Sequence, residues 1–491
     1  MKKMKGIVIG VAGALALAAC GDSGSATESG YDYEVIGQSS SSFTDISELL
    51  SSNRVEPVSS SHSELGSESA LSSSDAFLSS SQNQLSSSSS HSELGSESAL
   101  SSSEIVILSS SQNQLSSSSS VELVPMSSSS DPIHPRYAKI LGVDISQMQE
   151  FEAKGTRVLD VDGTPKDVFE LFRDHGFNYV RLKTFVSPKS KYGYAEGSCD
   201  QGAGTFGSNS EAFGDKEHVV AYAKRAKAAG FKLLLDFHYS DNWADPGKQI
   251  IPERWRNISS SDVMADSVYR YTKDVLNALK AAGALPEMVQ VGNEITNGLL
   301  RDVPNSKTDC WGNDVDLAKS SVSGVMSNST GIANTAKYLA AGSRAVKEVS
   351  NSIKTVFHIE SPHKTSTVDW WMKSIISDSK VSPDVMAFSA YTAYEHGNPD
   401  SWKTLFTHLA SKFQNLEFLI AEYNGASKSD YYAWDGSRVR TQQVMEQVPR
   451  GLGAFIWEPE RSGAWGTSMF DWVGNDLKAN PKAFDEYKVL F

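Results

Sequence analysis

The feature that most limits the fold is an alternation of short apolar runs with amphipathic segments from residue 136 onward. Short apolar runs bounded by polar residues are typical of buried strands, and the segments between them have helical spacing. We expect strands at 140–144, 177–182, 231–238, 288–293, 354–360, 385–391, 417–422 and 453–457. We expect helices between them at 167–175, 217–230, 262–283, 332–350, 369–377 and 401–413.

Strands that alternate with helical crossovers form a parallel sheet with right-handed connections. Eight such strands suit an α/β fold, the closed (β/α)8 TIM barrel, which takes about 250 residues or more. An open doubly wound sheet is the alternative. The first apolar run is not followed by a glycine-rich phosphate-binding loop, which disfavours that alternative. We therefore expect residues 135–491 to form a TIM-barrel domain.

The stretch before this domain has the composition of a linker. The length of 491 residues alone would suggest about three domains. However, residues 38–130 are dominated by serine, and the block 62–71 recurs at 91–100. Two copies with so few apolar residues cannot build the stacked core of a solenoid. We expect residues 20–134 to form a disordered, serine-rich tether.

The N-terminal segment has the features of an export signal. Three lysines precede an almost wholly apolar run at 6–19, which is too short to span a membrane comfortably. The sequence Leu17-Ala18-Ala19-Cys20 at its end resembles a bacterial lipoprotein box, whose cysteine is lipidated and becomes the mature N-terminus. This resemblance implies a signal peptide at 1–19 and a lipid anchor on Cys20, at the outer membrane or cell surface. Ordinary secretion is the alternative.

Cysteine content and charge limit the cofactors and partners. Cys199 and Cys310 would form a disulfide in an exported protein, but two free thiols fit the sequence equally well. The chain holds no cysteine and histidine cluster with zinc spacing, so we expect no metal and no cofactor. The net charge of −14, the pI of about 5.3 and the lack of a basic stripe argue against a nucleic-acid partner. We expect a monomer.

Polar or aromatic side chains terminate the expected strands. Because all strands of such a barrel end at one face, these side chains should share one pocket. The residues at these ends are Asp144, Arg181, His238, Asn293 with Glu294, His358 with Glu360, Tyr391, Glu422, and Trp457 with Glu458. Taken one at a time, Glu294 would suit a helix cap or a surface ion pair, Arg181 a buried ion pair, and the rings simple packing. Together they predict a binding site.

Two of these side chains, Glu294 and Glu422, end the fourth and seventh expected strands on opposite sides of the lumen. Retaining glycoside hydrolysis needs one protonated carboxylic acid for the leaving oxygen and one carboxylate that attacks the anomeric carbon. We assign the acid role to Glu294 and the nucleophile role to Glu422. Positive charge on Arg181 and His238 would keep Glu422 ionised. Asn293 would bond the 2-hydroxyl of the sugar.

The remaining predicted contacts are with the substrate. The predicted substrate-binding residues are Asp144, Arg181, His238, Asn293, Tyr391 and Trp457. Tryptophan faces suit sugar rings, and the candidates are Trp243, Trp255, Trp311, Trp457 and Trp465.

Several long motifs carry a family resemblance. They are DFHYSDNWADPGKQ at 236–249, VQVGNEITNG at 289–298, DHGFNYVRL at 174–182 and WEP at 457–459. Through them the chain resembles glycoside hydrolase family 53, the endo-β-1,4-galactanases, over nearly all of 138–491. The resemblance implies a retaining endo-glycosidase that cuts β-1,4-galactan in pectic arabinogalactan, with Glu294 as acid/base and Glu422 as nucleophile. The alternatives are another β-1,4-glycan, such as mannan or cellulose, or a surface lipoprotein that binds glycan without cutting it.

Overall fold

The computed structural model describes residues 137–195, 212–309, 311–425, 437–463 and 465–491. The predicted signal peptide, the lipidation site Cys20, the predicted tether, and both Cys199 and Cys310 lie outside these residues. In the part of the chain that the structure describes, no helix is both long and apolar enough to cross a membrane.

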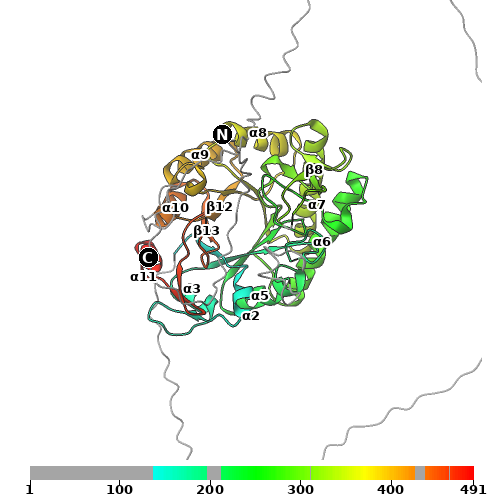
Figure 1. Cartoon of the computed structure of the whole chain (residues 1–491). Helices are drawn as coiled ribbons and strands as arrows, with labels where there is room; N and C mark the ends of the chain where they lie inside the picture. Colours follow the sequence, from blue (N-terminus) through cyan, green and yellow to red (C-terminus); the bar gives the residue numbers. More distant parts are fainter. Residues whose placement is uncertain (1–136, 196–211, 310, 426–436, 464) are drawn as a thin grey trace, which may run out of the picture. The chain divides into compact units, whose positions relative to one another are not determined.

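Eight parallel strands close into a barrel (Figure 1). In order around the barrel they are β1 (Ile140–Asp144), β13 (Gly451–Trp457), β12 (Glu417–Tyr423), β11 (Val385–Ser389), β10 (Lys354–Ile359), β5 (Met288–Val291), β4 (Lys232–Phe237) and β3 (Tyr179–Thr184). The barrel closes because Asp144 pairs with Trp457 on one side and with Arg181 on the other. Every predicted strand is present, so the TIM barrel is confirmed and the open sheet is wrong.

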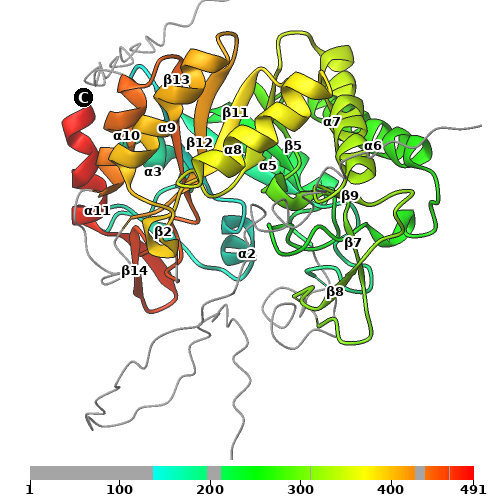
Figure 2. The same ribbon diagram turned by 90° about the horizontal axis from the view of Figure 1, so that it is seen from above.

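Helices surround the barrel (Figures 1 and 2). Those that the sequence predicts are α3 (Val168–Asp174), α5 (Lys216–Ala228), α6 (Ser261–Ala281), α7 (Ser329–Val349), α8 (Thr365–Met372) and α9 (Pro399–Lys412). Helix α8 continues directly into a π-helix, η4 (Lys373–Asp378). The largest buried apolar cluster, which includes Val268, Leu339 and Phe406, lies between these helices and the sheet.

Side chains fix where several of these helices begin. Asp167 accepts hydrogen bonds from the backbone N–H groups of Phe169 and Glu170 at the start of α3. Asn398 and Ser401 form a capping box at the start of α9. Each cap satisfies backbone donors that have no partner within the helix.

Among the described residues, the sequence pattern missed the helices α2 (Met148–Ala153), α10 (Ser437–Gln447) and α11 (Pro481–Asp485). Helix α10 buries polar side chains as well as apolar ones: Arg438, Thr441 and Gln442 beside Val444 and Met445. Because those polar groups find partners in the fold, such as the Ala454 carbonyl for Gln442, α10 needs no wide apolar stripe. The chain ends in α11 (Pro481–Asp485) and a 3-10 helix, η6 (Glu486–Leu490).

Loops at the C-terminal ends of the strands carry small sheets of their own (Figure 2). The loop after β1 holds β2 (Val158–Leu159), which pairs with the hairpin β14 (Phe470–Val473) and β15 (Asp476–Ala479) from the loop after β13. The loop after β5 pairs β6 (Gly298–Leu299) with β9 (Gly324–Val325), and β7 (Asp302–Pro304) with β8 (Val315–Leu317). The 3-10 helices of these loops are η2 (Glu253–Trp255), η3 (Ile295–Asn297) and η5 (Thr392–Tyr394). Elements this short have too little periodicity to be predicted from sequence.

Apolar side chains fill the lumen near the N-terminal ends of the strands. This apolar layer consists of Ile140, Leu234, Met288, Val356, Val385, Ala387, Leu419, Ala421 and Phe455, all buried. Gly142 leaves room for one of these rings, since a Cβ at Gly142 would lie 2.3 Å from Cδ1 of Phe455. Side chains alternate between the two faces of a strand, so the next inward position lies two residues farther along. Four of those next positions are polar: Asp236, Gln290, His358 and Ser389 follow Leu234, Met288, Val356 and Ala387.

Candidate active site

At the C-terminal ends of the strands the lumen becomes charged around Arg181. Its guanidinium group is fully buried and lies 2.8 Å from Asp144 Oδ2 and 2.9 Å from Asp236 Oδ2. Its Nη1 also lies 3.0 Å from Glu422 Oε1. Burial alone would lower the pKa of Arg181, but the three carboxylates outweigh it and the net shift is upward. One permanent cation is therefore shared by carboxylates from β1, β4 and β12.

Two members of this network, Asp236 and Gln290, were missed in the sequence. Gln290 Nε2 donates to Asp236 Oδ1 at 2.6 Å, and Gln290 Oε1 accepts from Arg181 at 3.3 Å. They follow Leu234 and Met288 of the apolar layer by two residues, so they face the same lumen. A polar residue inside an apolar strand is the signal that would have found both.

Glu422 is held by donors on both carboxyl oxygens. Oε1 faces Arg181, and Oε2 accepts a hydrogen bond from the Tyr391 hydroxyl at 2.9 Å. Burial raises the pKa of Glu422, and the charges of Asp144 and Asp236 add to it, while Arg181 and Tyr391 oppose the rise. The net shift of the pKa is upward, and the two groups in direct contact with this carboxyl, Arg181 and Tyr391, favour its charged form.

Glu294 has a strained backbone and a different environment. It follows Gly292, whose φ is 92°, and itself has a φ of 48°, an uncommon value outside glycine. Although it occupies the N-cap position of η3, its side chain makes no capping hydrogen bond, so the helix-cap interpretation is wrong. Its carboxyl group instead has a hydrogen bond with Ser389, and the residue as a whole is partly exposed.

The two glutamates interact with each other, and their surroundings separate their pKa values. The pKa of Glu294 is raised well above its ordinary range, first by burial and then by the negative charge of Glu422. Glu360 and Asp245 raise it further, and the hydrogen bond with Ser389 opposes them. Glu422 has a cation against it and Glu294 faces carboxylates. Glu422 therefore loses its proton first, and Glu294 keeps its own.

His238 does not lie where the sequence placed it. Its Nδ1 accepts from the backbone N–H of Ala244 at 3.0 Å, which puts the ring proton on Nε2, 3.2 Å from Asp236 Oδ2. The ring therefore supports Asp236, and the expectation that it acts directly on Glu422 is corrected. The ring is also packed against Phe185, with centroids 4.7 Å apart.

Asn293 is fixed by its neighbours. Arg181 can only donate, so its bond of 2.9 Å identifies the acceptor, Oδ1, and sets the orientation of the Asn293 amide. On the other side, Nδ2 donates to the Ala244 carbonyl at 2.9 Å. This leaves one amide N–H for a further acceptor.

His358 and Ser389 complete the buried polar layer. His358 Nε2 lies 2.9 Å from Ser389 Oγ, and Nδ1 lies 3.0 Å from Asn293 Oδ1. Burial, and then the charge of Arg181, lower the pKa of His358 far below its ordinary value. The ring is therefore neutral. Ser389 lies two residues after Ala387 of the apolar layer. The sequence next to Ser389 does not indicate that it belongs to the site.

An aromatic wall stands beside the carboxylates. Trp457, at the end of β13, lies edge-on to Tyr391, with centroids 6.3 Å apart, and to Trp465, at 4.9 Å. Lys183, which the sequence analysis missed, is buried with Nζ 4.4 Å from the Trp243 ring and 5.3 Å from the Trp457 ring. Trp457 and Trp243 are each partly exposed, as a sugar-binding face requires.

The other predicted tryptophan platforms differ in exposure. Trp255 is 6% exposed and packs edge-on against Tyr271 in the main core, so its predicted role is wrong. Trp465 is 8% exposed, and Trp311 is partly exposed.

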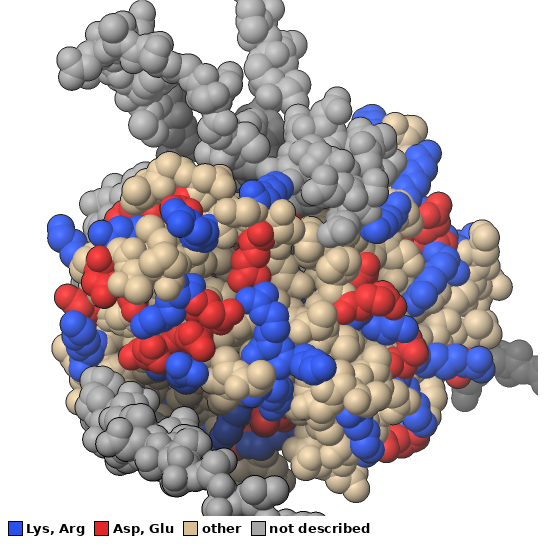
Figure 3. Space-filling model, turned by 90° about the horizontal axis from the view of Figure 1, so that it is seen from below, with Lys and Arg blue, Asp and Glu red and all other residues tan. Residues whose placement is uncertain are grey.

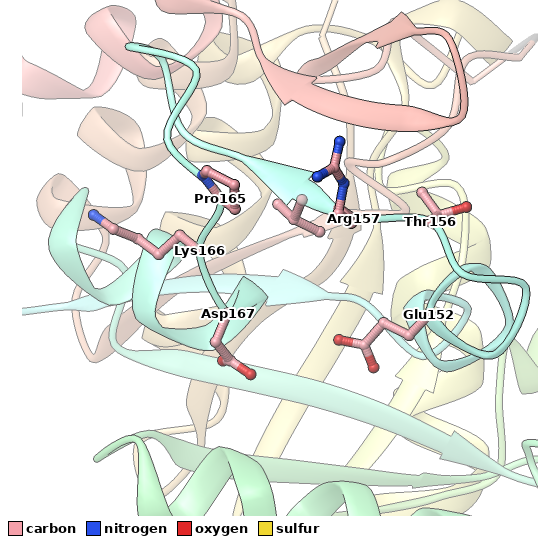
Figure 4. Close-up of a pocket in the computed structure, with 7 residues that line it drawn as sticks. Glu152, Thr156, Arg157, Pro165, Lys166 and Asp167 are labelled. Carbon is pink, nitrogen blue, oxygen red and sulfur yellow. The ribbon is translucent and has the colours of Figure 1, made fainter.

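Two cavities lined by described residues lie away from the candidate active site. One, of about 370 Å³, lies between α2, β2 and the start of α3 and includes Glu152, Arg157 and Asp167 in its lining (Figure 4). These charges are paired elsewhere: Arg157 with Asp476 at 2.6 Å, and Glu152 with Arg225 at 2.6 Å. The second, of about 330 Å³, is lined by residues around β7 to β9. On the face in Figure 3, basic and acidic side chains are interspersed.

Comparison with known proteins identifies relatives. The sequence model of the family described as glycosyl hydrolase family 53 matches residues 140–449. The endo-beta-1,4-galactanase of Bacillus subtilis (strain 168) is 30% identical over 342 residues, which cover 65% of this chain and 70% of the relative. The arabinogalactan endo-beta-1,4-galactanase of Thermothelomyces thermophilus is 27% identical over 338 residues, which cover 65% and 88%.

A solved structure agrees with these sequence relatives. The Ignisphaera aggregans GH53 catalytic domain superimposes with a TM-score of 0.56 and 27% identity, over 72% of this chain and 98% of that chain.

Proposed function

Because the chain belongs to glycosyl hydrolase family 53 and is a glycosidase, we propose that it hydrolyses internal β-1,4-galactosidic bonds. The proposed substrates are galactan and the arabinogalactan side chains of pectin. The names of two relatives, endo-beta-1,4-galactanase and arabinogalactan endo-beta-1,4-galactanase, support this substrate.

The observation that carries the proposed chemistry is the unequal environment of Glu294 and Glu422. Arg181 lies 3.0 Å from one oxygen of Glu422, and the Tyr391 hydroxyl donates to the other. The neighbours of Glu294 are carboxylates, which raise its pKa. A pair of carboxyl groups with separated pKa values supplies both an acid and a nucleophile at one pH. We assign the acid/base role to Glu294 and the nucleophile role to Glu422.

In the first step Glu422 attacks the anomeric carbon and forms a glycosyl ester. The bond from that carbon to the leaving oxygen breaks, and the proton of Glu294 passes to this oxygen. The ester neutralises Glu422, but Arg181 remains compensated by Asp144 and Asp236, at 2.8 Å and 2.9 Å. The cation is therefore not left unpaired in the intermediate.

In the second step Glu294 acts as a base. Because the charge of Glu422 contributes to the raised pKa of Glu294, ester formation lowers that pKa and favours the carboxylate. Glu294 takes a proton from water, the water oxygen bonds to the anomeric carbon, and the ester bond breaks. Glu422 returns as a carboxylate and Glu294 as an acid.

Other residues of the site would bind the sugar. The remaining N–H of Asn293 suits the 2-hydroxyl, where a hydrogen bond strengthens at the transition state. Trp457 offers a partly exposed face for a ring. Asp144, Arg181 and His238 hold the network in place, and Tyr391 orients Glu422.

The test is an assay of Glu294→Gln and Glu422→Gln on linear galactan, with products sized by chromatography. Either substitution should reduce kcat/KM by at least about a thousandfold, because each role supplies several kcal/mol of transition-state stabilisation. The matched control is Glu417→Gln, at the opposite end of β12, where the carboxylate pairs with Lys354 at 2.6 Å. Near-normal turnover by either active-site variant would refute the assignment.

A second measurement separates the two roles. With an aryl β-galactobioside and azide, Glu294→Ala should still form the ester, and azide then replaces it to give the β-azide. Glu422→Ala should give the α-azide, since azide takes the place of the carboxylate in a single displacement. The reverse pattern would exchange the roles.

Parallel incubations with mannan and cellulose test the alternative substrates. Cleavage of either in preference to galactan would replace the proposed substrate while keeping the chemistry. Retention of the protein by a galactan affinity gel without release of reducing ends would favour a glycan-binding lipoprotein.

We also propose that Cys20 carries lipid and anchors the enzyme to a membrane, on the strength of the sequence from Leu17 to Cys20. Labelling with radioactive palmitate and membrane fractionation of wild type and Cys20→Ser test this. Equal membrane recovery of the two proteins would refute it.

A further inference from the structure

Three charged side chains form ion pairs beside the tryptophans of the candidate active site. Glu458, the residue after Trp457, is 1% exposed and has a cation near each carboxyl oxygen. Its Oε1 lies 3.4 Å from Lys183 Nζ, and its Oε2 lies 3.2 Å from Arg461 Nη1. We call Lys183, Glu458 and Arg461 the ion triad. One buried carboxylate therefore interacts with two cations, one from β3 and one from the loop after β13.

The backbone at Glu458 is held in an uncommon conformation. Its φ is 44°, in the left-handed region that few residues other than glycine adopt. Its backbone N–H donates to the Asp144 carbonyl at 3.1 Å. A strained residue of this kind persists only where the surrounding structure fixes it. Here the end of β1 holds the backbone, and Lys183 and Arg461 hold the carboxyl group.

Each cation of the ion triad lies over a tryptophan ring. Lys183 Nζ is 4.4 Å from the ring centroid of Trp243 and 5.3 Å from that of Trp457. Arg461 Cζ is 5.7 Å from the centroid of Trp465, which packs edge-on against Trp457 at 4.9 Å. We call Trp243, Trp457 and Trp465 the tryptophan wall. A cation within about 6 Å of a ring centroid is attracted to the ring, most strongly where water is excluded.

The charge of Lys183 is stabilised by both carboxylates and rings. Lys183 is 2% exposed, and among the described residues its only hydrogen bond is the one with Glu458. Burial lowers the pKa of Lys183, but Asp144, at 3.8 Å, and Glu458 outweigh burial, and the net shift is upward. The side chain therefore stays charged. Because one hydrogen bond leaves two of its three N–H groups, the faces of Trp243 and Trp457 supply further stabilisation.

We propose that the members of the ion triad are positioning residues, which hold the tryptophan wall in one conformation before a sugar binds. The inference rests on the proposed function, in which Trp457 receives a sugar ring of galactan. A surface that is already ordered avoids the free-energy cost of ordering side chains on binding. Trp457 also packs edge-on against Tyr391, which donates to Glu422. The ion triad thus orders the sugar face and supports the ring beside the nucleophile.

The first test is calorimetric binding of β-1,4-galactotetraose in a Glu294→Gln background, which the proposed mechanism makes inactive. Lys183→Met keeps an unbranched side chain but removes its charge. The Kd should rise about tenfold, since ordering each loosened ring costs about a two- to tenfold loss of affinity. Lys183→Arg keeps a cation at the rings and should restore most of the affinity. The control Lys273→Met removes a cation 5.1 Å from the Tyr269 ring on α6 and should not change the Kd.

The second test observes the rings directly and does not depend on the folding of a Lys183 variant. Fluorine NMR of the enzyme labelled with fluorotryptophan gives one line for each ring, and Trp457→Phe and Trp465→Phe identify two of these lines. Both lines should be narrow in the wild type, broadened or split in Arg461→Met, and narrow in Arg461→Lys, which keeps the charge. Arg461 is partly exposed, so its replacement leaves no buried cavity.

Three results would overturn the inference. They are an unchanged Kd in Lys183→Met, an equal loss of affinity in Lys183→Met and Lys183→Arg, and narrow single lines of Trp457 and Trp465 in Arg461→Met. A loss of stability alone, without a change in Kd or in the lines, would therefore count against it.

Failure of this inference is distinct from failure of the proposed function. If wild type cleaves galactan and Glu294→Gln does not, while Lys183→Met binds galactotetraose as tightly as its parent, the positioning role alone is refuted. If the wild type neither cleaves galactan nor binds galactotetraose, the proposed substrate is wrong.

Discussion

Two layers of the same barrel lumen have opposite chemistry. The layer near the N-terminal ends of the strands is apolar, as in Leu234, Met288 and Val356. Two residues farther along the same strands stand Asp236, Gln290 and His358, all fully buried. The strands, their spacing and their exposure to water are the same in both layers. Only the side chains differ.

The difference shows how the barrel divides stability from chemistry. Burial of the apolar layer stabilises the fold by about 25 cal/mol for each Å² removed from water. Buried charges cost free energy unless each is paired and hydrogen-bonded. The charged layer meets that condition by sharing Arg181 among Asp144, Asp236 and Glu422, at 2.8 to 3.0 Å. The charged layer supplies the reacting groups, and burial of the apolar layer offsets the free-energy cost of burying these charges.

The substitution with the largest expected effect is Arg181→Met, which tests whether the charged layer depends on this cation. Removal of the cation leaves three buried carboxylates without compensation, so we expect a loss of about 3–5 kcal/mol of unfolding free energy and of activity. Urea unfolding and galactan hydrolysis measure the two effects. The control Arg157→Met removes an exposed pair with Asp476 and should change neither. Retained activity in Arg181→Met would show that the charged layer does not depend on this cation.

A complementary substitution in the apolar layer is Leu419→Ala. Its side chain is fully buried, so truncation should cost about 2–5 kcal/mol of stability. Because the reacting groups lie farther along the strands, kcat/KM per folded molecule should stay within about twofold of wild type, the spread expected for a site not in contact. Unfolding midpoints and activity at low temperature measure this. A much larger fall in kcat/KM would show that the two layers are not separable.

Glu150 of α2 is a buried carboxyl that differs from those around Arg181. Its Oε2 has no hydrogen-bond partner among the described residues. Burial raises its pKa from 4.5 to about 8. A carboxyl with a raised folded pKa contributes stability below the unfolded value and loses it as the pH rises to the folded value. Unfolding free energy should therefore fall between these two pH values.

Glu150→Gln should remove its share of that slope and stabilise the protein by up to about 5 kcal/mol above pH 8, since each pKa unit is worth about 1.4 kcal/mol. Urea unfolding at pH 5 and pH 8.5 checks this. A wild-type protein that is equally stable at both pH values, or a variant with the same slope, would contradict it.

The smallest effect concerns one hydrogen bond within the charged layer. Tyr391→Phe removes the donor to Glu422 Oε2 at 2.9 Å, so kcat/KM should fall about tenfold, as for one hydrogen bond to a charged group. This bond lowers the pKa of Glu422, so the acidic limb of the pH profile should move to higher pH. The pH–rate profile gives both results. An unchanged acidic limb would mean that Tyr391 serves packing alone.

Much of the fold could be predicted from local pattern. Each apolar run from 140–144 to 453–457 became a barrel strand, because a short apolar run that is buried on both faces can be recognised from neighbours in sequence alone. Helix α10 could not be predicted, since it buries Arg438 and Gln442 against partners that come from elsewhere. The two-residue strands β2, β6 and β9 depend on pairing across loops, which no local pattern records.

The sequence predicted which residues lie in the site better than it predicted which of their side chains contact each other. Asp144, Arg181, Asn293, Tyr391 and Glu422 converge as expected, and their catalytic and binding roles stay predictions. His238 was assigned to the wrong carboxylate, and Trp255 belongs to the core. Lys183, Asp236 and Ser389 were not predicted because they lie within β3, β4 and β11, whereas the expected site residues stand mostly at or beyond the ends of the apolar runs.

By itself, the sequence determined that eight strands would form and that chemically able side chains would stand at their ends, because both follow from the alternation of neighbours along the chain. Only the tertiary structure decided which carboxylates share Arg181 and which glutamate faces carboxylates instead. That choice depends on how the strands register when the barrel closes, which brings together residues from β1, β3, β4 and β12. Electrostatic energy falls with distance in space, and spacing along the chain does not report that distance.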